Sequence, residues 1–322
     1  MTQAPSKQRT LIATLGPASL DQALEVTQAG ADVFRLNGSH MSPEALDRAL
    51  GQIRHACPDV PVVVDLQGAK MRLGSFEPRS IAHGQSFALA HDERDSTAIP
   101  LPHAEVFRAV RAGDTLSCDD DRVHLRVEQV DGDRMRVAAL ADAVLRPRKG
   151  VNVLEHPVHL EDLSQTDIAQ LEVARRHEHV SFAVSFMRDG HEAGWVRSRV
   201  PGARVIGKIE RAEAIESLSA IAERVDALWI CRGDLGAQVG VVELARWLSD
   251  FDPTEMSVPT FIAGQVLEHL TRHANPTRSE VCHLHDLLKR GYVGVVLSDE
   301  TAIGVDPVHA TSIASDLLRS LG

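Results

Sequence analysis

The chain has 322 residues, of which 43% are hydrophobic and 25% charged, as in a globular protein with room for one large barrel or two to three smaller domains. A formal net charge of −11 at pH 7 argues against nucleic acid as the main partner, because nucleic acids are themselves polyanions. The sequence contains no apolar run of about 18 residues that could span a membrane, residues 1–9 lack the apolar centre of a signal peptide, and the four cysteines are scattered. We therefore expect a cytoplasmic protein with reduced thiols.

Short apolar runs rich in β-branched residues recur along the chain, and helical patterns separate most of them. The runs cover residues 10–15, 32–36, 60–66, 180–186, 205–209, 227–231, 258–263 and 293–297. The helical patterns cover residues 20–29, 43–56, 165–176, 212–223 and 307–321. Alternation of strand and helix predicts a parallel sheet, and nearly continuous apolar strands predict a sheet covered on both faces. Eight such strands predict an α/β fold, a closed (β/α)8 TIM barrel.

The pattern changes between the third and the fourth run. Here residues 115–118, 123–127 and 134–138 form short alternating segments, and Gly113 and Gly132 lie in turn-like sequences. We predict an all-β domain over residues 73–147, inserted after the third barrel strand and dividing the barrel into residues 1–72 and 148–322. An insertion at this end of a barrel is well placed to act as a lid.

Two carboxylates and a lysine lie at the ends of consecutive predicted strands. Lys208 and Glu210 close the run at residues 205–209, and Asp234 follows the run at residues 227–231. The carboxyl ends of the strands carry the active site in a parallel barrel, and paired carboxylates suit Mg²⁺ or Mn²⁺. Lys208 would then lie beside the metal, where it could neutralise a developing oxyanion or phosphoryl charge. The turn around Gly233 can present free N–H groups at a helix start, which is a good seat for a substrate carboxylate.

Sixteen histidines are many for this length, and four of them lie close together in the sequence. His269 and His273 share a helical face, with His283 and His285 nearby. A metal site there is the weaker interpretation, because no third ligand has a fitting spacing.

The motifs at the strand ends follow one another in a fixed order. They are Thr14-Leu15-Gly16-Pro17-Ala18-Ser19, Arg35-Leu36-Asn37-Gly38-Ser39-His40, Asp65-Leu66-Gln67-Gly68-Ala69-Lys70-Met71-Arg72, Arg148-Lys149-Gly150-Val151-Asn152, Ser185-Phe186-Met187-Arg188, Lys208-Ile209-Glu210, Arg232-Gly233-Asp234-Leu235-Gly236, Pro276-Thr277-Arg278-Ser279-Glu280 and Ser298-Asp299-Glu300-Thr301-Ala302. From about Arg9 to the last helix, this ordered set resembles the pyruvate kinase family.

The resemblance implies a barrel with an inserted β lid that transfers phosphoryl from phosphoenolpyruvate to a nucleoside diphosphate, using divalent and often monovalent cations. It implies that Glu210 and Asp234 hold the divalent metal, and that Lys208 stabilises the transition state and the enolate. The other implied roles are phosphoryl contact for Arg35 and Arg72, substrate binding for Gly233, Asp234, Gly264 and Ser185, monovalent-cation binding for Asn37, Ser39 and Asp65, and nucleotide contact for Pro17, His40, Asp120 and Lys149.

Four departures from the family pattern bear on function. Gly264 stands where a threonine usually borders the substrate carboxylate, and Gln67 stands where a lysine is usual. Lys70 stands where many members carry glutamate, so its ammonium group is expected to replace K⁺ and to make the reaction independent of that ion. The sequence stops at Gly322, where relatives continue into a C-terminal domain, so we expect no regulation through such a domain.

Three functions remain open at this point. The leading one is a phosphotransferase of pyruvate kinase type, acting on phosphoenolpyruvate or pyruvate and ADP or ATP, because phosphoryl transfer needs the positioning and charge compensation that these residues offer. The second is a metal-dependent enolate enzyme for another 2-oxo acid, an aldolase or decarboxylase, which Gly264 suggests. The third is a catalytically weak binding or regulatory protein. We expect no nucleic-acid or membrane partner, and homo-oligomerisation stays open.

Overall fold

The computed structural model describes residues 9–119 and 121–321. It divides into two compact units, which are described separately. The first comprises the chain up to Gly68 together with the chain from Leu163 onward, and the second is Ala69–Asp162. Within the described residues, no helix combines the length and apolar character needed to cross a membrane.

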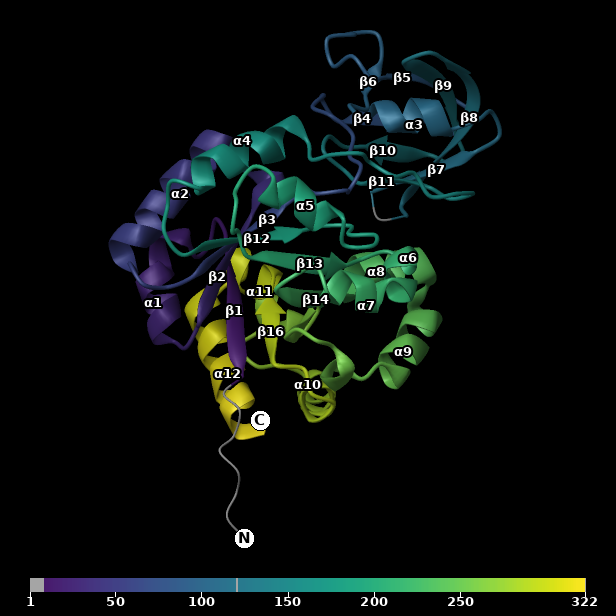
Figure 1. The fold of residues 1–322 in the computed structure, drawn as a ribbon. Coiled ribbons are helices and arrows are strands. Elements are labelled where there is room, and N and C mark those ends of the chain that lie inside the picture. The colour runs from purple at the N-terminus through teal and green to yellow at the C-terminus, as the bar shows by residue number, and fades with distance from the viewer. Residues whose placement is uncertain (1–8, 120, 322) are drawn as a thin grey trace. The chain divides into compact units, whose positions relative to one another are not determined.

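The first unit is a closed barrel of eight parallel strands, which confirms the predicted (β/α)8 fold (Figure 1). Around the barrel each strand pairs with its neighbours in the order β1-β16-β15-β14-β13-β12-β3-β2. The strands are β1 (Thr10–Leu15), β2 (Val33–Asn37), β3 (Val62–Leu66), β12 (Val180–Val184), β13 (Val205–Ile209), β14 (Ala227–Cys231), β15 (Thr260–Ala263) and β16 (Gly294–Leu297).

Helices surround this barrel (Figure 1). They are α1 (Ala23–Gln28), α2 (Pro43–Ala56), α4 (Gln165–Ala174), α5 (Glu192–Arg197), α6 (Ala212–Glu216), α7 (Leu218–Ala222), α8 (Arg232–Val239), α9 (Val241–Asp250), α10 (Arg278–Lys289), α11 (Asp299–Ala302) and α12 (Pro307–Leu321), with short 3₁₀ turns η1 (Leu20–Gln22), η2 (Gly38–His40), η3 (Pro253–Glu255) and η4 (Glu268–Thr271). Two of them begin at capping residues: the hydroxyl of Ser42 caps α2 ahead of Pro43, and Thr277 and Glu280 form a capping box at α10.

Alternate residues of the strands fill the barrel. Ile12, Val63, Ile206, Trp229 and Phe261 come from five strands and belong to one buried cluster, so these positions face the interior. The intervening residues are also buried, as expected for strands covered by helices on the outside. Because side chains alternate with a period of two, residues two positions beyond each interior residue also face the barrel axis, at its carboxyl end.

The second unit is rich in β-structure and contains one short helix, α3 (Ala104–Ala109), so it is not purely β. Six of its strands form one sheet in the order β11-β7-β8-β9-β5-β6, and β10 pairs with β4. The strands are β4 (Arg79–Ile81), β5 (Ser86–Ala90), β6 (Ile99–Pro100), β7 (Thr115–Cys118), β8 (Val123–Asp131), β9 (Arg134–Ala139), β10 (Ala143–Leu145) and β11 (Val151–Val153). It follows β3 and precedes β12 in the chain.

Candidate active site

Charged side chains occupy the last interior layer at the carboxyl end of the barrel. Arg35, Asp65 and Lys208 each lie two residues beyond a residue that packs inside the barrel, namely Val33, Val63 and Ile206. Alternation therefore directs all three side chains to the barrel axis. All three are buried or nearly so. Ionic groups enter a barrel core in this way only when they satisfy one another.

Asp65 is the centre of a buried ion-pair network. Its Oδ2 accepts from Arg35 Nε at 2.8 Å and from Arg35 Nη2 at 2.6 Å, and Lys208 Nζ lies 3.1 Å from the same oxygen. Lys208 Nζ also donates to Ser185 Oγ at 2.8 Å and lies 3.0 Å from Glu210 Oε1. Thr14 Oγ1 accepts a third bond from Arg35, at 2.9 Å. The network fixes both cations at the mouth of the barrel.

The network keeps its members ionised. Burial alone would lower the pKa of Lys208, but Asp65 and Glu210 outweigh it and the pKa is raised. Burial would raise the pKa of Asp65, yet Lys208 and Arg35 lower it below its usual value. A permanently cationic lysine and arginine in a low-dielectric site interact strongly with any anionic ligand.

Glu210 provides oxygen donors beside these cations, and Asp234 follows β14 at the same end of the barrel. Glu210 is 2% exposed, and its Oε2 accepts the backbone N–H of Phe186 at 2.9 Å. Phe186 makes this bond from a left-handed conformation, with φ of 58°. The sequence analysis placed Phe186 inside a strand, whereas β12 ends at Val184. Asp234 lies in the first turn of α8. Two carboxylates form a hard donor set that fits Mg²⁺ or Mn²⁺.

A buried thiol that the sequence analysis assigned no role lies near both carboxylates. Burial raises the pKa of Cys231 well above its ordinary value, and the negative charges of Glu210 and Asp234 raise it further. The alternation that places Trp229 inside the barrel could have identified Cys231 as its inward-facing neighbour.

Gly264 has a backbone reason to be glycine. Its φ is 80° and that of Gln265 is 52°, and the guanidinium of Arg232 donates to the carbonyl oxygens of both residues at 2.6–2.9 Å. A Cβ on Gly264 would lie 3.4 Å from the backbone nitrogen of Gly233, at the start of α8. The family pattern predicts only that Gly264 replaces a threonine beside the substrate carboxylate. The structure shows that a left-handed turn is also involved, which a threonine would strain.

The other predicted barrel positions lie at or just beyond the carboxyl ends of β1, β2 and β3. Pro17 follows β1, and His40 is the last residue of η2. Asn37 Oδ1 accepts the N–H of Ser39 at 3.2 Å and so caps this 3₁₀ turn. Gln67 donates its backbone N–H to Asp167 at 2.9 Å.

The sequence matches the family model for the pyruvate kinase barrel domain over residues 6–311. The pyruvate kinase of Methylorubrum extorquens is 31% identical over 318 residues, which cover 95% of this chain and 66% of that protein. The pyruvate kinase of Aeropyrum pernix is 32% identical over 313 residues, which cover 93% of this chain and 68% of the relative. The chain belongs to the pyruvate kinase family. The chain spans about two thirds of the length of these two pyruvate kinases.

The remaining residues that the family resemblance singled out lie in the second unit. The backbone of Arg72 forms an isolated antiparallel β-bridge with Gly150, and Arg72 Nη1 donates to Arg148 O at 2.9 Å. The side chain of Lys70 packs beside Gly150, where an added Cβ would lie 3.1 Å from Lys70 Cε. Lys149 Nζ lies 2.9 Å from Asp119 Oδ1. Asp120, predicted to contact the nucleotide, lies outside the described residues.

A buried histidine that the sequence analysis did not consider supports Arg72. His103 Nε2 accepts the backbone N–H of Arg72 at 2.9 Å. Burial lowers the pKa of His103 to about 4, so the ring is neutral near pH 7 and can accept this bond. Its sequence context, Pro102-His103-Ala104, carries no motif that would have indicated this contact.

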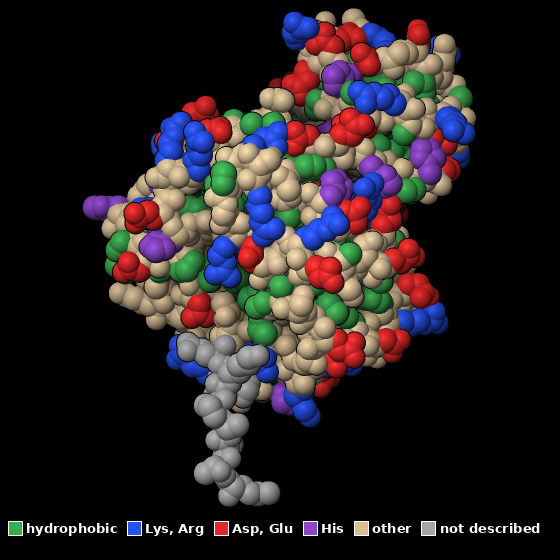
Figure 2. Space-filling view, viewed as in Figure 1, with side chains coloured by type: hydrophobic (Ala, Val, Ile, Leu, Met, Phe, Trp, Pro, Cys, Tyr) green, Lys and Arg blue, Asp and Glu red, His purple; other side chains and the backbone are tan. Residues whose placement is uncertain are grey.

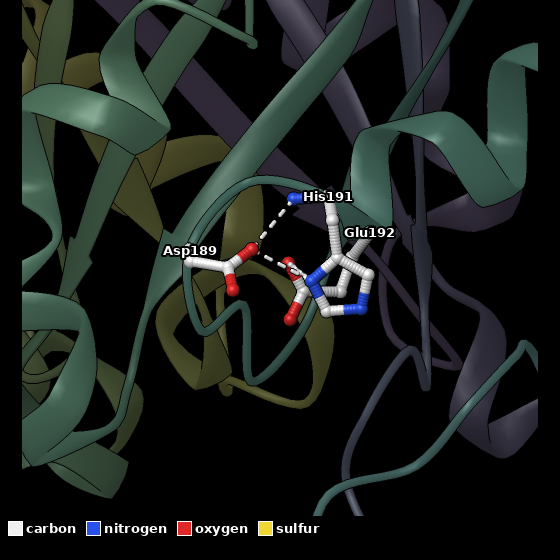
Figure 3. Close-up of side chains that lie close together, drawn as sticks. All are labelled: Asp189, His191 and Glu192. Atoms are coloured by element: carbon white, nitrogen blue, oxygen red, sulfur yellow. Dashed lines mark hydrogen bonds and ion pairs between the residues drawn. The ribbon is translucent and has the colours of Figure 1, made fainter.

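His269, His273, His283 and His285, for which a metal site was the weaker interpretation, do not form a cluster of metal ligands among the described residues. His269 and His273 stack with ring centroids 3.9 Å apart, and His269 Nδ1 lies 2.8 Å from Asn275 O. One other group, Asp189, His191 and Glu192, brings three potential ligand atoms within 4.8 Å of one another (Figure 3).

Hydrogen bonds within the loop account for the geometry of that second group. His191 Nδ1 lies 2.7 Å from Asp189 Oδ1 (Figure 3). Arg188 donates to Asp189 Oδ2. Glu192 accepts the backbone N–H groups of Arg188 and Gly190. These hydrogen bonds stabilise the loop that leads into α5. They account for the closeness of the three side chains without a bound ion.

Proposed function

We propose that the chain transfers a phosphoryl group between phosphoenolpyruvate, or a related enol phosphate, and a nucleoside diphosphate, and that it requires Mg²⁺ or Mn²⁺. The observation that carries this proposal is Lys208, a buried ammonium held between Asp65 and Glu210 at the carboxyl end of the barrel. Membership of the pyruvate kinase family supports the same chemistry. Lys/Arg and Asp/Glu side chains are interspersed over the face in Figure 2, so a local cationic site of this kind would have to attract the anionic substrates.

Each charged residue has a distinct part in the proposed reaction. Arg35 and Lys208 compensate the charge on the transferring phosphoryl group, and Lys208 also stabilises the enolate that remains. Arg72 is a further phosphoryl contact. Glu210 and Asp234 would hold the divalent ion, which when bound polarises the oxygens of the substrate. The N–H groups at the start of α8 offer a seat for the substrate carboxylate, beside Gly233.

We further propose that the reaction does not depend on K⁺. The three residues matched to a monovalent-cation site are Asn37, Ser39 and Asp65, but Asp65 Oδ2 already accepts from Arg35 and Lys208. A K⁺ ion next to these two cations would be repelled, and Lys70 would add a third positive charge. Pro17, His40, Asp120 and Lys149 are proposed to contact the nucleotide. The acceptor is proposed to be ADP, with ATP the corresponding product.

A second candidate function follows from Gly264. A Cβ at position 264 would lie 3.4 Å from Gly233 N and 3.6 Å from Arg232 N, so its absence leaves space that a 2-oxo acid larger than pyruvate could fill. A metal that chelates a 2-oxo acid and polarises its carbonyl would equally serve aldol cleavage or decarboxylation. Retention of Arg35 in the charged network favours phosphoryl transfer over these reactions.

A coupled assay separates the two functions. Pyruvate formed from phosphoenolpyruvate and ADP in the presence of Mg²⁺ is detected by its reduction, while a panel of 2-oxo acids is tested for cleavage under the same conditions. We expect pyruvate formation that is lost in the Lys208→Met variant. Cleavage of a 2-oxo acid without any ADP-dependent turnover would contradict the phosphotransferase and favour the second function.

A further inference from the structure

Two chain segments join the barrel unit to the inserted unit. The chain leaves the barrel after β3, through Gln67 and Gly68, and returns at Leu163, just before α4. The leaving segment carries Lys70 and Arg72 within the next four residues of the sequence. A group that holds both segments therefore fixes the two points at which the chain leaves and re-enters the barrel unit.

Asp167, in the first turn of α4, contacts both segments. Its Oδ1 accepts the N–H of Gln67 at 2.9 Å, and its Oδ2 accepts the N–H of Gly68 at 3.2 Å. The same Oδ2 accepts the hydroxyl of Ser164 at 2.9 Å, and Ser164 Oγ accepts the N–H of Asp167 in return. Asp167 is 1% exposed. One buried carboxylate thus accepts from the outgoing and the returning segment together.

The outgoing segment has little freedom to rearrange at this point. Gly68 has φ of 59°, and a Cβ there would lie 2.5 Å from Ser185 O and 2.7 Å from Ser185 N. The chain is therefore pressed against the end of β12, and its N–H is directed to Asp167. Loss of the acceptor would leave buried N–H groups without partners, which is costly enough to displace the segment.

Ionisation of Asp167 costs folding stability. Burial raises the pKa of Asp167 to about 6, although hydrogen bonds from Ser164, Gln67 and Gly68 favour the ionised form and limit the rise. The folded protein thus prefers the protonated acid relative to an unfolded chain, whose aspartate has a pKa of about 3.9. This contribution to stability is present at low pH and is lost as the pH rises through about 6. The groups facing Asp167 are the backbone of Gln67 and Gly68 and the hydroxyl of Ser164, and among the described residues no cation pairs with it.

We propose that Asp167 is a positioning residue: its carboxylate ties together the two connections between the barrel and the inserted unit, and so fixes the path of the segment that carries Lys70 and Arg72. The catalytic part of this inference rests on the proposed function, since Arg72 is there a phosphoryl contact.

Hydrogen exchange of the whole chain tests the tie without reference to activity. We expect the amides of Gln67 and Gly68 to exchange at least about 10-fold faster in Asp167→Asn than in the unmodified protein, because the amide side chain offers one acceptor oxygen instead of two. The matched control is Glu280→Gln, since Glu280 is also a helix-start carboxylate that accepts backbone N–H groups, those of His269 and Thr277. That variant should accelerate exchange only around residues 269–280.

The unmodified protein provides a second measurement that needs no substitution. After correction for intrinsic exchange, protection of Gln67 and Gly68 should rise between about pH 8 and about pH 5, because an opening that exposes Asp167 to water returns its pKa to about 3.9 and is therefore opposed when the buried acid is protonated; Asp167→Asn should lack this change. Equal protection in the two proteins, or protection that does not vary with pH in the unmodified one, would overturn the proposal. If Asp167→Asn does not fold, the pH series on the unmodified protein still decides.

Kinetics then connect the tie to the reaction. Asp167→Asn should lower kcat/KM for phosphoenolpyruvate by about 10- to 100-fold, the loss expected when a reacting group is displaced by about 1 Å. Mn²⁺ binding should stay unchanged, because Glu210 and Asp234 are not involved. Faster exchange with unaltered kcat/KM would contradict the positioning role. Absence of phosphotransfer in the unmodified protein would instead contradict the proposed function and leave the exchange result standing.

Discussion

Replacing Asp65 by asparagine removes the carboxylate that pairs with both Arg35 and Lys208, while keeping the shape of the side chain. The two cations would stay buried and would face each other across a neutral amide. At an effective dielectric of 20, each attraction over 4 Å is worth about 4 kcal/mol, and part of this gain offsets the cost of burying the charges. Removing one partner of a buried ion pair therefore costs about 3–5 kcal/mol.

Thermal unfolding of the Asp65→Asn variant measures this cost. For a unit of roughly this size, each kcal/mol shifts Tm by about 2–4 °C, so Tm should fall by about 6–20 °C. The control is Glu243→Gln, which breaks the pair with Arg246, where both side chains are at least 60% exposed. An exposed pair contributes about 0–1 kcal/mol.

The pH dependence provides a second check on Asp65. Its pKa is lowered in the folded protein, so its contribution is present above the ordinary aspartate pKa of about 3.9 and is lost as the pH falls through the folded value. The difference in Tm between the unmodified protein and Asp65→Asn should accordingly shrink in acid. A Tm for Asp65→Asn that matches the Glu243→Gln control at neutral pH would refute the buried network.

Three further predictions concern the metal, the monovalent cation and the turn at Gly264. Glu210→Gln should weaken Mn²⁺ binding, measured by electron paramagnetic resonance, by about 10-fold or more, since a neutral amide is a poor ligand for a hard cation; unchanged affinity would exclude Glu210 as a ligand. Turnover in tetraalkylammonium buffer should not rise when K⁺ is added, and Lys70→Glu should create a K⁺ requirement; a strong response of the unmodified protein would contradict this. Gly264→Ala should lower stability by about 1–2 kcal/mol in chemical unfolding, because φ is 80° there; an unaltered midpoint would argue against the left-handed turn.

The barrel could be predicted from the sequence because its strands are nearly continuous apolar runs. The run that ends at Ile209 and the run that ends at Cys231 became β13 and β14 with the predicted bounds. The predicted ends of helices were less accurate where the chain departs from the helical pattern of its sequence. The predicted helix over residues 212–223 is interrupted at Ser217, which separates α6 from α7.

The contacts among the charged residues were harder to predict from the sequence than the strands. Side-chain alternation directs Arg35, Asp65 and Lys208 to one layer, but the sequence alone does not say that Asp65 pairs with both cations. Contacts between segments distant in the chain, such as His103 with the backbone of Arg72 or Asp167 with Gly68, leave no periodic signal. The left-handed conformations of Phe186 and Gln265 were also unforeseen, because non-glycine residues seldom adopt them.

Phosphorus NMR of the protein with phosphoenolpyruvate, ADP and Mg²⁺ tests the central claim most directly, because it follows the phosphoryl group itself. The account predicts that the phosphoenolpyruvate resonance is replaced by that of the ATP γ-phosphate, without accumulation of inorganic phosphate, and that Lys208→Met abolishes this conversion. Phosphoenolpyruvate that persists with metal-saturated protein, or that is hydrolysed without forming ATP, would contradict it.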